Sequence, residues 1–110
     1  MNYTPSFAFL SPTQQAASLF SEALGLHQQG QLDAAHALYQ KVLKIRPKHP
    51  DTLQLMGTLA LQRGQYADAI DWIQRSLKLN GRNASAWNNL GLSYKKLGRF
   101  EEALGAFDRA

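Results

Sequence analysis

The residues in this chain best suited to chemistry are three histidines, His27, His36 and His49. Histidine binds metals and transfers protons near neutral pH, and a metal site on a helix needs two ligands three or four residues apart. No two of these histidines have that spacing, and no acidic cluster accompanies them. The sequence therefore predicts no metal site and favours histidines that lie at the surface.

Other kinds of catalytic site also lack the residues that they need. The chain contains no cysteine, which excludes thiol nucleophiles, disulfides and thiolate metal sites. Serine, histidine and aspartate do not occur together in a recognisable nucleophile motif, and the glycines follow a repeat rather than a phosphate-binding loop. We therefore expect no catalytic, cofactor-binding or metal-binding residues, and the chain alone is not predicted to be an enzyme.

The charged residues indicate a solvated surface. The net charge is +4, but the lysines and arginines are spread along the chain with acids between them rather than forming a stripe. This pattern disfavours a nucleic-acid partner. No apolar run approaches the roughly 20 residues that cross a bilayer, and residues 1–10 lack the basic start of a secretion signal. We therefore expect no membrane partner and a cytoplasmic location.

A period of 34 residues organises the chain. Three glycines recur at this interval: Gly30, Gly64 and Gly98. Three alanines follow them, each five residues later: Ala35, Ala69 and Ala103. Glycine favours the left-handed conformation just beyond the end of a helix, so each repeat is predicted to be two helices joined by a turn. Such hairpins bury their apolar faces by stacking on one another.

Residues inside each repeat specify how its two helices meet. The first helix carries a small residue that allows close approach of the second: Ala23, Gly57 or Gly91. The second helix carries a large residue four positions after its alanine: Tyr39, Ile73 or Phe107. Before the first repeat, Ser11, Pro12 and Gln14 form a helix-start signal, which predicts a helix from about Pro12 to about Gln29.

Residues 16–110 resemble the tetratricopeptide repeat family. The third repeat carries the resemblance most closely, through Trp87, Leu90, Gly91, Tyr94, Gly98, Phe100, Ala103, Phe107 and Ala110. The resemblance implies an all-α fold, a right-handed α-solenoid of three helix-turn-helix repeats, and no catalytic chemistry. The predicted units are an N-terminal segment (1–15) and repeats at 16–49, 50–83 and 84–110, the last of them incomplete.

The family geometry also implies a concave groove lined by the first helices. Its predicted peptide-binding residues are Phe20, Leu24, His27, Leu55, Thr58, Asn88, Asn89, Leu92, Lys95 and Lys96. An asparagine amide both donates and accepts hydrogen bonds, which suits a peptide backbone. Asn88 and Asn89 are equally compatible with ordinary solvated positions on a helix. We predict a scaffold that binds a peptide or helical segment of a protein partner.

Some tetratricopeptide domains hold the C-terminal carboxylate of heat-shock chaperones through a clamp of lysine, asparagine and arginine. The matching positions in this chain are Phe20, Leu24, Leu55, Ser85 and Asn89. Only Asn89 resembles the clamp, which disfavours that function.

Two alternative functions stay open. The repeats are similar in style to the tetratricopeptide regions of bacterial glycosyltransferases that resemble O-GlcNAc transferase. The chain would then recruit substrates for a larger enzyme that continues beyond Ala110. Alternatively, the repeats drive self-assembly, with a homodimer as the simplest form. The apolar residues that would seek cover in that case are Phe7, Phe9, Leu10, Leu104 and Phe107.

Overall fold

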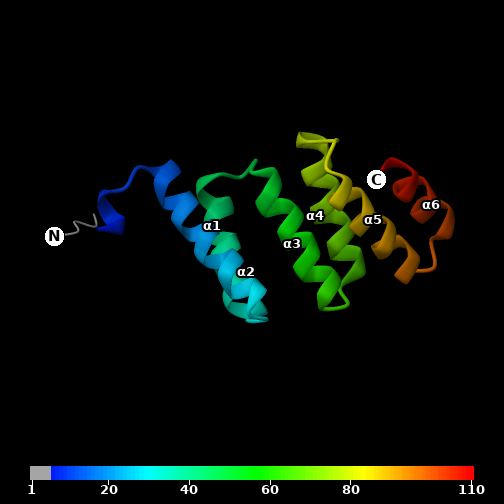
Figure 1. Cartoon of the computed structure of the whole chain (residues 1–110), viewed down its shortest axis with the longest axis horizontal. Coiled ribbons are helices and arrows are strands. Elements are labelled where there is room, and N and C mark those ends of the chain that lie inside the picture. The colour runs from blue at the N-terminus through cyan, green and yellow to red at the C-terminus, as the bar shows by residue number, and fades with distance from the viewer. Residues whose placement is uncertain (1–5) are drawn as a thin grey trace. The chain divides into compact units, whose positions relative to one another are not determined.

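The computed structural model describes residues 6–110, which are helical throughout and contain no strand (Figure 1). The elements follow in this order: η1 (Phe7–Phe9), α1 (Pro12–Gln28), α2 (Leu32–Ile45), α3 (Pro50–Gln62), α4 (Tyr66–Leu79), α5 (Ala84–Lys96) and α6 (Phe100–Arg109). The predicted all-α class is confirmed. Residues 1–5 of the predicted N-terminal segment lie outside the described residues.

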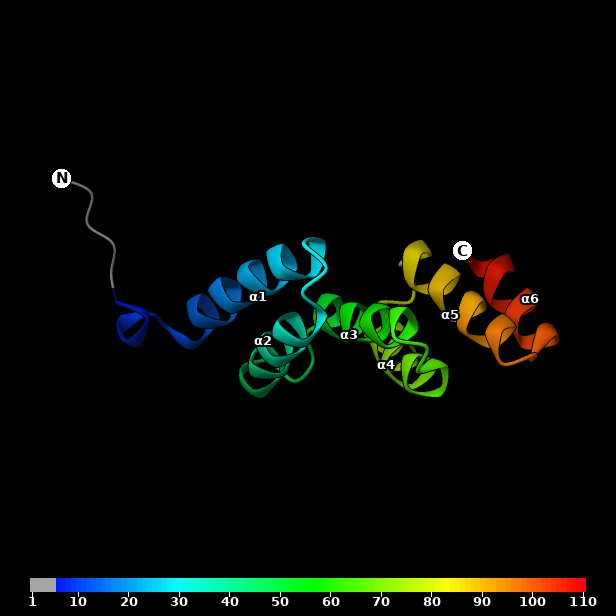
Figure 2. The ribbon, with the colours of Figure 1, turned by 90° about the horizontal axis from the view of Figure 1, so that it is seen from below.

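The helices pair as hairpins inside two compact units, Met1–Pro47 and Lys48–Ala110. The first unit contains the hairpin of α1 and α2, and the second contains the hairpins α3/α4 and α5/α6 (Figure 2). Within the second unit α4 also packs against α5, and α3 lies beside α5. Each hairpin corresponds to one copy of the sequence repeat.

The turns between paired helices adopt the predicted left-handed conformation. The backbone φ angles are 79° at Gly30, 75° at Gly64 and 76° at Gly98. After the first of these glycines, the backbone N–H of Gln31 donates to the carbonyl oxygen of Leu26 at 2.9 Å. The other two turns close with the same bond, which satisfies a carbonyl that the helix end leaves unpaired. One short turn therefore reverses the chain at the same place in every repeat.

The start of α1 confirms the predicted capping signal. The backbone N–H of Gln14 donates to the Ser11 hydroxyl at 3.2 Å, and the N–H of Ser11 donates to the Gln14 side chain at 2.9 Å. Pro12 occupies the first helical position, where a missing N–H costs nothing. Gln15 then ties the preceding segment to α1, because its side-chain amide donates to the carbonyl oxygens of Phe7 and Leu10.

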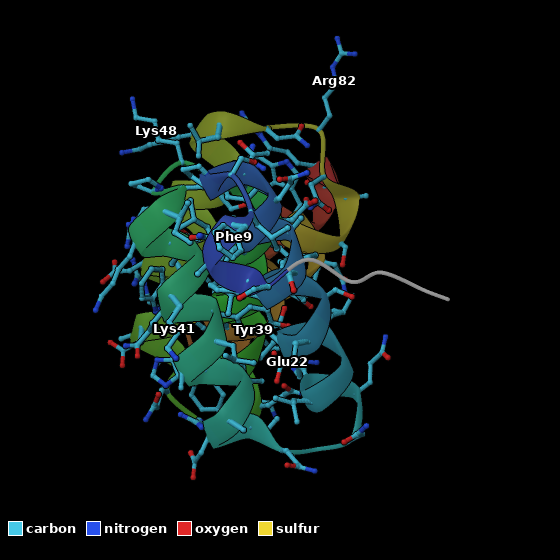
Figure 3. All side chains as sticks on the ribbon, turned by 90° about the vertical axis from the view of Figure 1, so that its left-hand side faces the viewer. Phe9, Glu22, Tyr39, Lys41, Lys48 and Arg82 are labelled. Atoms are coloured by element: carbon cyan, nitrogen blue, oxygen red, sulfur yellow. The ribbon has the colours of Figure 1, made fainter. Side chains whose placement is uncertain are left out.

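The core of the first unit forms around Tyr39. Figure 3 shows this side chain between α1 and α2, where it is fully buried. Small or branched residues surround the contact between the helices, and Ala23, Ala35 and Val42 are buried with it. The Phe20 ring lies 6.2 Å from the Tyr39 ring between centroids, in a tilted arrangement that aromatic pairs favour.

The core of the second unit continues from α4 through α5 to α6. Its buried members include Ile73, Leu77, Leu90, Tyr94, Ala103 and Ala106, and Trp72, Trp87 and Phe107 pack against them at its edge. One buried polar contact joins α4 to the start of α3, where the Ser76 hydroxyl donates to the carbonyl oxygen of Pro50 at 2.8 Å. The two hairpins of this unit therefore share one hydrophobic core.

Two glycines in this core lie directly against large side chains of the paired helix. Gly57 on α3 packs against Ile73, and Gly91 on α5 packs against the ring of Phe107. A Cβ atom at Gly91 would lie 2.5 Å from that ring, closer than side chains tolerate. The predicted close approach of paired helices at Gly57 and Gly91 is confirmed.

We expect Gly91→Ala to lower the free energy of unfolding by about 1–3 kcal/mol, because the new methyl group overpacks the contact with Phe107. Gly105→Ala is the matched control, since it lies on the paired helix α6 and a Cβ there meets nothing within 4 Å. The control should gain up to about 1 kcal/mol from higher helix propensity. Urea denaturation measures the free energy of unfolding of both variants. Equal changes of the same sign in the two variants would contradict the close contact between Gly91 and Phe107.

Candidate functional site

In the second unit, α3 and α5 lie side by side and present their solvent-facing residues on one surface. We call this the α3/α5 surface. It comprises Gln54, Leu55 and Thr58 from α3 and Asn88, Asn89, Leu92, Lys95 and Lys96 from α5. All of these except Gln54 belong to the set of binding residues predicted above, and the structure brings them together.

The Thr58 hydroxyl is the centre of a hydrogen-bond network on the α3/α5 surface. It accepts bonds from the side-chain amides of Asn89, at 3.2 Å, and Gln54, at 3.1 Å. It donates its own proton to the backbone carbonyl of Gln54 at 3.1 Å, one helical turn earlier. A hydroxyl with one donor and two accepted bonds is fully used. Thr58 therefore fixes the orientation of Asn89 across the contact between the two helices.

Asn89 keeps most of its hydrogen-bonding capacity. A side-chain amide has two N–H donors and one carbonyl acceptor, and the bond to Thr58 uses only one donor. Asn89 is half-buried, so solvent reaches it. The remaining N–H and the oxygen match the C=O and N–H of an extended peptide, and their orientation is set before any ligand binds.

The rest of the α3/α5 surface combines apolar and cationic groups. Leu55 and Leu92 are half-buried and expose part of their side chains, whereas Asn88 is exposed. Lys95 and Lys96 are exposed in the last turn of α5, where the helix dipole favours positive charge. This combination suits a ligand with an apolar side chain and an acidic group.

The three predicted binding residues on α1, Phe20, Leu24 and His27, belong to the first unit and are half-buried there. Phe20 contacts the Tyr39 ring, and His27 does so as well. The Nδ1 atom of His27 lies 3.0 Å from the Tyr39 hydroxyl oxygen, a hydrogen-bonding distance. Phe20 and His27 therefore hold the first hairpin together, and a binding role for the three residues stays a prediction.

The three histidines, predicted to lie at the surface, are partly exposed. His27 and His49 are half-buried and hydrogen-bonded, the latter through an Nδ1 atom 2.6 Å from the Thr52 hydroxyl, and His36 is half-buried too. In the described part of the chain, no three metal-ligating side chains gather at one place. The same residues include no helix that is both long and apolar enough to cross a membrane.

The residues predicted for self-association differ in their exposure. Phe9 is 83% exposed (Figure 3) and Phe7 is exposed as well, whereas Leu10 is half-buried. On α6, Leu104 is 63% exposed, but Phe107 is half-buried because its ring packs on Gly91. Phe107 therefore has a packing role inside its own hairpin.

A comparison with known protein families matches most of the chain. A family model described as "Anaphase-promoting complex, cyclosome, subunit 3" matches residues 28–110. The chain belongs to this family. Membership of the anaphase-promoting complex subunit 3 family agrees with the tetratricopeptide-like repeats seen in both sequence and structure.

Curated relatives match parts of longer proteins. The photosystem I assembly protein Ycf3 of Synechococcus sp. (strain CC9605) is 34% identical over 91 residues, which cover 78% of this chain and 53% of Ycf3. Superkiller protein 3 of Saccharomyces cerevisiae is 30% identical over 57 residues, 52% of this chain and 4% of that protein. The chain thus spans about half or less of the length of these relatives.

Solved tetratricopeptide domains have the same fold. One of them is the second such domain of Spaghetti (RPAP3), bound to the HSP90 peptide SRMEEVD. It matches with a TM-score of 0.83 at 21% identity, and the match covers 87% of this chain and 89% of the Spaghetti chain. The Sgt2 tetratricopeptide domain from Aspergillus fumigatus matches with a TM-score of 0.82 at 22% identity. This match covers 97% of the present chain and 69% of the Sgt2 chain. The resemblance to tetratricopeptide repeats is therefore confirmed.

The aromatic contact in the first unit generates a prediction about alkaline pH. Burial raises the pKa of Tyr39 to about 12, above the usual value of about 10. The folded protein then holds this proton more tightly than the unfolded chain, so the free energy of unfolding falls as the pH rises from about 10 towards 12. We expect Tyr39→Phe to flatten this fall, measured by urea denaturation at a series of pH values.

His27→Gln is the control for that experiment, because it removes the imidazole near Tyr39 but leaves the buried hydroxyl in place. This variant should keep the alkaline fall of the parent. If the parent and Tyr39→Phe lose stability with the same slope, the burial of Tyr39 is not the cause.

Proposed function

We propose that this chain is a non-catalytic protein-interaction module, and that its α3/α5 surface binds an extended peptide segment of a protein partner. The observation that carries the proposal is the amide of Asn89, which Thr58 orients while leaving a donor and an acceptor for a ligand. Such preorganisation lowers the entropy lost on binding.

The side chains around Asn89 determine which kind of peptide the α3/α5 surface is expected to prefer. Leu55 on α3 and Leu92 on α5 offer apolar contact, and Lys95 and Lys96 offer positive charge in the last turn of α5. Pockets that bind ligands well combine apolar contact with a few placed polar groups in this way. The expected ligand is a peptide with an apolar residue near an acidic one.

The comparisons support an interaction role without naming the partner. Solved domains with this fold include one bound to a peptide, and the relative Ycf3 is described as an assembly protein. Recruitment of substrates to a larger glycosyltransferase would use the same kind of surface and stays an alternative. A cytoplasmic location also stays a prediction.

The proposal is tested with a peptide selected against the full chain from a random library displayed on phage. We expect Asn89→Ala to weaken binding of that peptide by about tenfold, because a peptide backbone group loses its partner. Thr58→Val keeps the shape of the side chain but releases Asn89, so it should weaken binding by a smaller factor. Fluorescence anisotropy of the labelled peptide measures both affinities.

The charge of the α3/α5 surface needs a separate measurement. Replacing both Lys95 and Lys96 by alanine should weaken binding by about fivefold at low salt, with a smaller effect at high salt. Replacing Lys41 and Lys44, two exposed lysines on α2, removes the same charge elsewhere and is the matched control. Unchanged affinity in both Asn89→Ala and the Lys95/Lys96 variant would exclude this surface as the binding site.

Exposed apolar residues on and beside α6 favour self-association as a second candidate function. Phe100 is 66% exposed and Leu104 63% exposed, and they stand four residues apart on one face of α6. Leu97, in the preceding turn, is 44% exposed. A specific dimer through such a face would bury on the order of 1,000 Å² or more.

We expect the chain to sediment as a dimer at tens of micromolar, and Leu104→Glu to sediment as a monomer because a carboxylate resists burial. Leu79→Glu is the control, since Leu79 is 44% exposed at the end of a different helix. Phe107 is left unchanged because it packs inside the hairpin. Analytical ultracentrifugation that shows a monomeric parent would refute this second function.

A further inference from the structure

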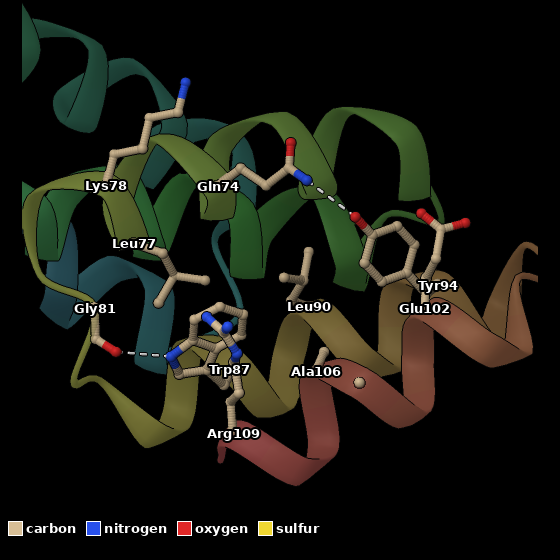
Figure 4. A pocket seen from close by; sticks show the side chains of 11 residues that line it. Gln74, Leu77, Lys78, Gly81, Trp87, Leu90, Tyr94, Glu102, Ala106 and Arg109 are labelled. Carbon is tan, nitrogen blue, oxygen red and sulfur yellow. Dashed lines mark hydrogen bonds between the residues drawn. The ribbon is translucent and has the colours of Figure 1, made fainter.

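A pocket of about 660 Å³ opens between α4 and α6, with α5 as its floor (Figure 4). It lies within the second unit and involves none of the α3/α5 surface. Trp87, Leu90 and Tyr94 line it from α5, whereas Asn89, Leu92 and Lys96 lie on the other side of the same helix, because each residue turns an α-helix by about 100°. A ligand in the pocket therefore leaves the α3/α5 surface free.

The centre of the pocket is apolar. Leu77 from α4 and Trp87 and Leu90 from α5 point into it in Figure 4. On the opposite wall α6 contributes Gly105 and Ala106, whose small size leaves the space open. The volume falls in the range of about 300–1,000 Å³ that is typical of ligand pockets. The pocket accommodates a large apolar side chain.

The Trp87 end of the pocket is held in place and positively charged. The Trp87 indole N–H donates to the carbonyl oxygen of Gly81 at 2.8 Å, which fixes the ring. The Arg109 guanidinium lies over the same ring, 5.0 Å from its centroid. Lys78 adds a second positive charge at the rim, although its side chain points away from Trp87 in Figure 4.

Glu102, at the other end of the pocket, is paired with a positive charge. Glu102 accepts two bonds from the Arg99 guanidinium, at 2.8 and 2.6 Å. Beside it, the Tyr94 hydroxyl accepts a bond from the Gln74 amide at 2.9 Å, which leaves the hydroxyl proton available to an acceptor. The pocket thus offers an apolar centre, a cation at one end and a neutral donor at the other.

We propose that this pocket is a second binding site, for a peptide segment in which a large apolar residue stands next to an acidic one. The apolar side chain packs against Leu77, Trp87 and Leu90, and the carboxylate pairs with Arg109. Charge complementarity selects an acidic segment rather than a basic one. The pocket is open to solvent, so one side chain of a bound segment can enter it.

Fluorescence of Trp87 tests the proposal directly. Trp72→Phe leaves Trp87 as the sole tryptophan of the chain, and the probe is the peptide acetyl-Gly-Glu-Leu-Phe-Glu-Gly-amide, which contains no tryptophan. We expect a saturable change of Trp87 emission with this peptide. A version with lysine in place of both glutamates should bind at least about tenfold more weakly. No saturable change up to millimolar peptide would overturn the proposal.

Two variants in the Trp72→Phe background locate the binding. Gly105→Leu places a side chain at the lining of the pocket, where a Cβ meets nothing within 4 Å, and it should abolish binding. Gly25→Leu is the matched control on α1, where a Cβ is equally unobstructed, and it should bind like the parent. Arg109→Gln should weaken binding by about fivefold through loss of the charge pair.

Two further results distinguish a peptide site in the pocket from binding at the α3/α5 surface and from a small-molecule site. Asn89→Ala should leave binding of the probe peptide unchanged, because Asn89 belongs to the α3/α5 surface. If this variant loses binding, the probe peptide binds at the α3/α5 surface and the proposal is overturned.

Dodecanoate is the comparison for a free amphipathic anion. If dodecanoate binds in a way that depends on Gly105 while the peptide does not bind, the pocket is a small-molecule site and the peptide proposal is wrong.

Discussion

The close approach of paired helices at Gly57 and Gly91 is the constraint on which the second unit depends. A glycine lets Ile73 or Phe107 rest directly on the backbone of the partner helix, so the two helices of a hairpin have one way to meet. Once α5 is held at Gly91, its apolar stripe faces α4 and α6 and its polar side faces solvent. Both candidate binding surfaces follow from that single choice of orientation.

Most of the fold was predictable because its signals are local. The left-handed glycines, the capping pair of Ser11 and Gln14, and the small residues opposite large ones each act within one hairpin. The same locality places Asn89, Lys95 and Lys96 on the solvent-facing side of α5, since a helix with a known buried face also has a known exposed one. Their binding role stays a prediction.

Contacts between elements were not predictable from the pattern. Thr58 and Asn89 lie in different repeats, and no local rule pairs their side chains. The contact of His27 with Tyr39 is of the same kind, because Tyr39 lies on the neighbouring helix. The pocket beside Trp87 was not predictable either. Trp87, Leu90 and Tyr94, which form its floor, have the spacing of an ordinary buried helix face. Leu90 and Tyr94 are indeed buried, and the space beside them depends on the residues opposite, which on α6 are small.

The sequence separation of the cross-helix bonds bears on how the chain reaches its fold. The bond from Asn89 to Thr58 spans 31 residues, the one from Ser76 to Pro50 spans 26, and the one from Gln74 to Tyr94 spans 20. Each therefore closes a loop no longer than about one repeat, which costs little chain entropy. The bonds from Asn89 to Thr58 and from Gln74 to Tyr94 join neighbouring hairpins, whereas the bond from Ser76 to Pro50 lies inside one. In an array of repeats, stability is approximately the sum of interactions inside each repeat and interactions between neighbours, and the second unit contains bonds of both kinds.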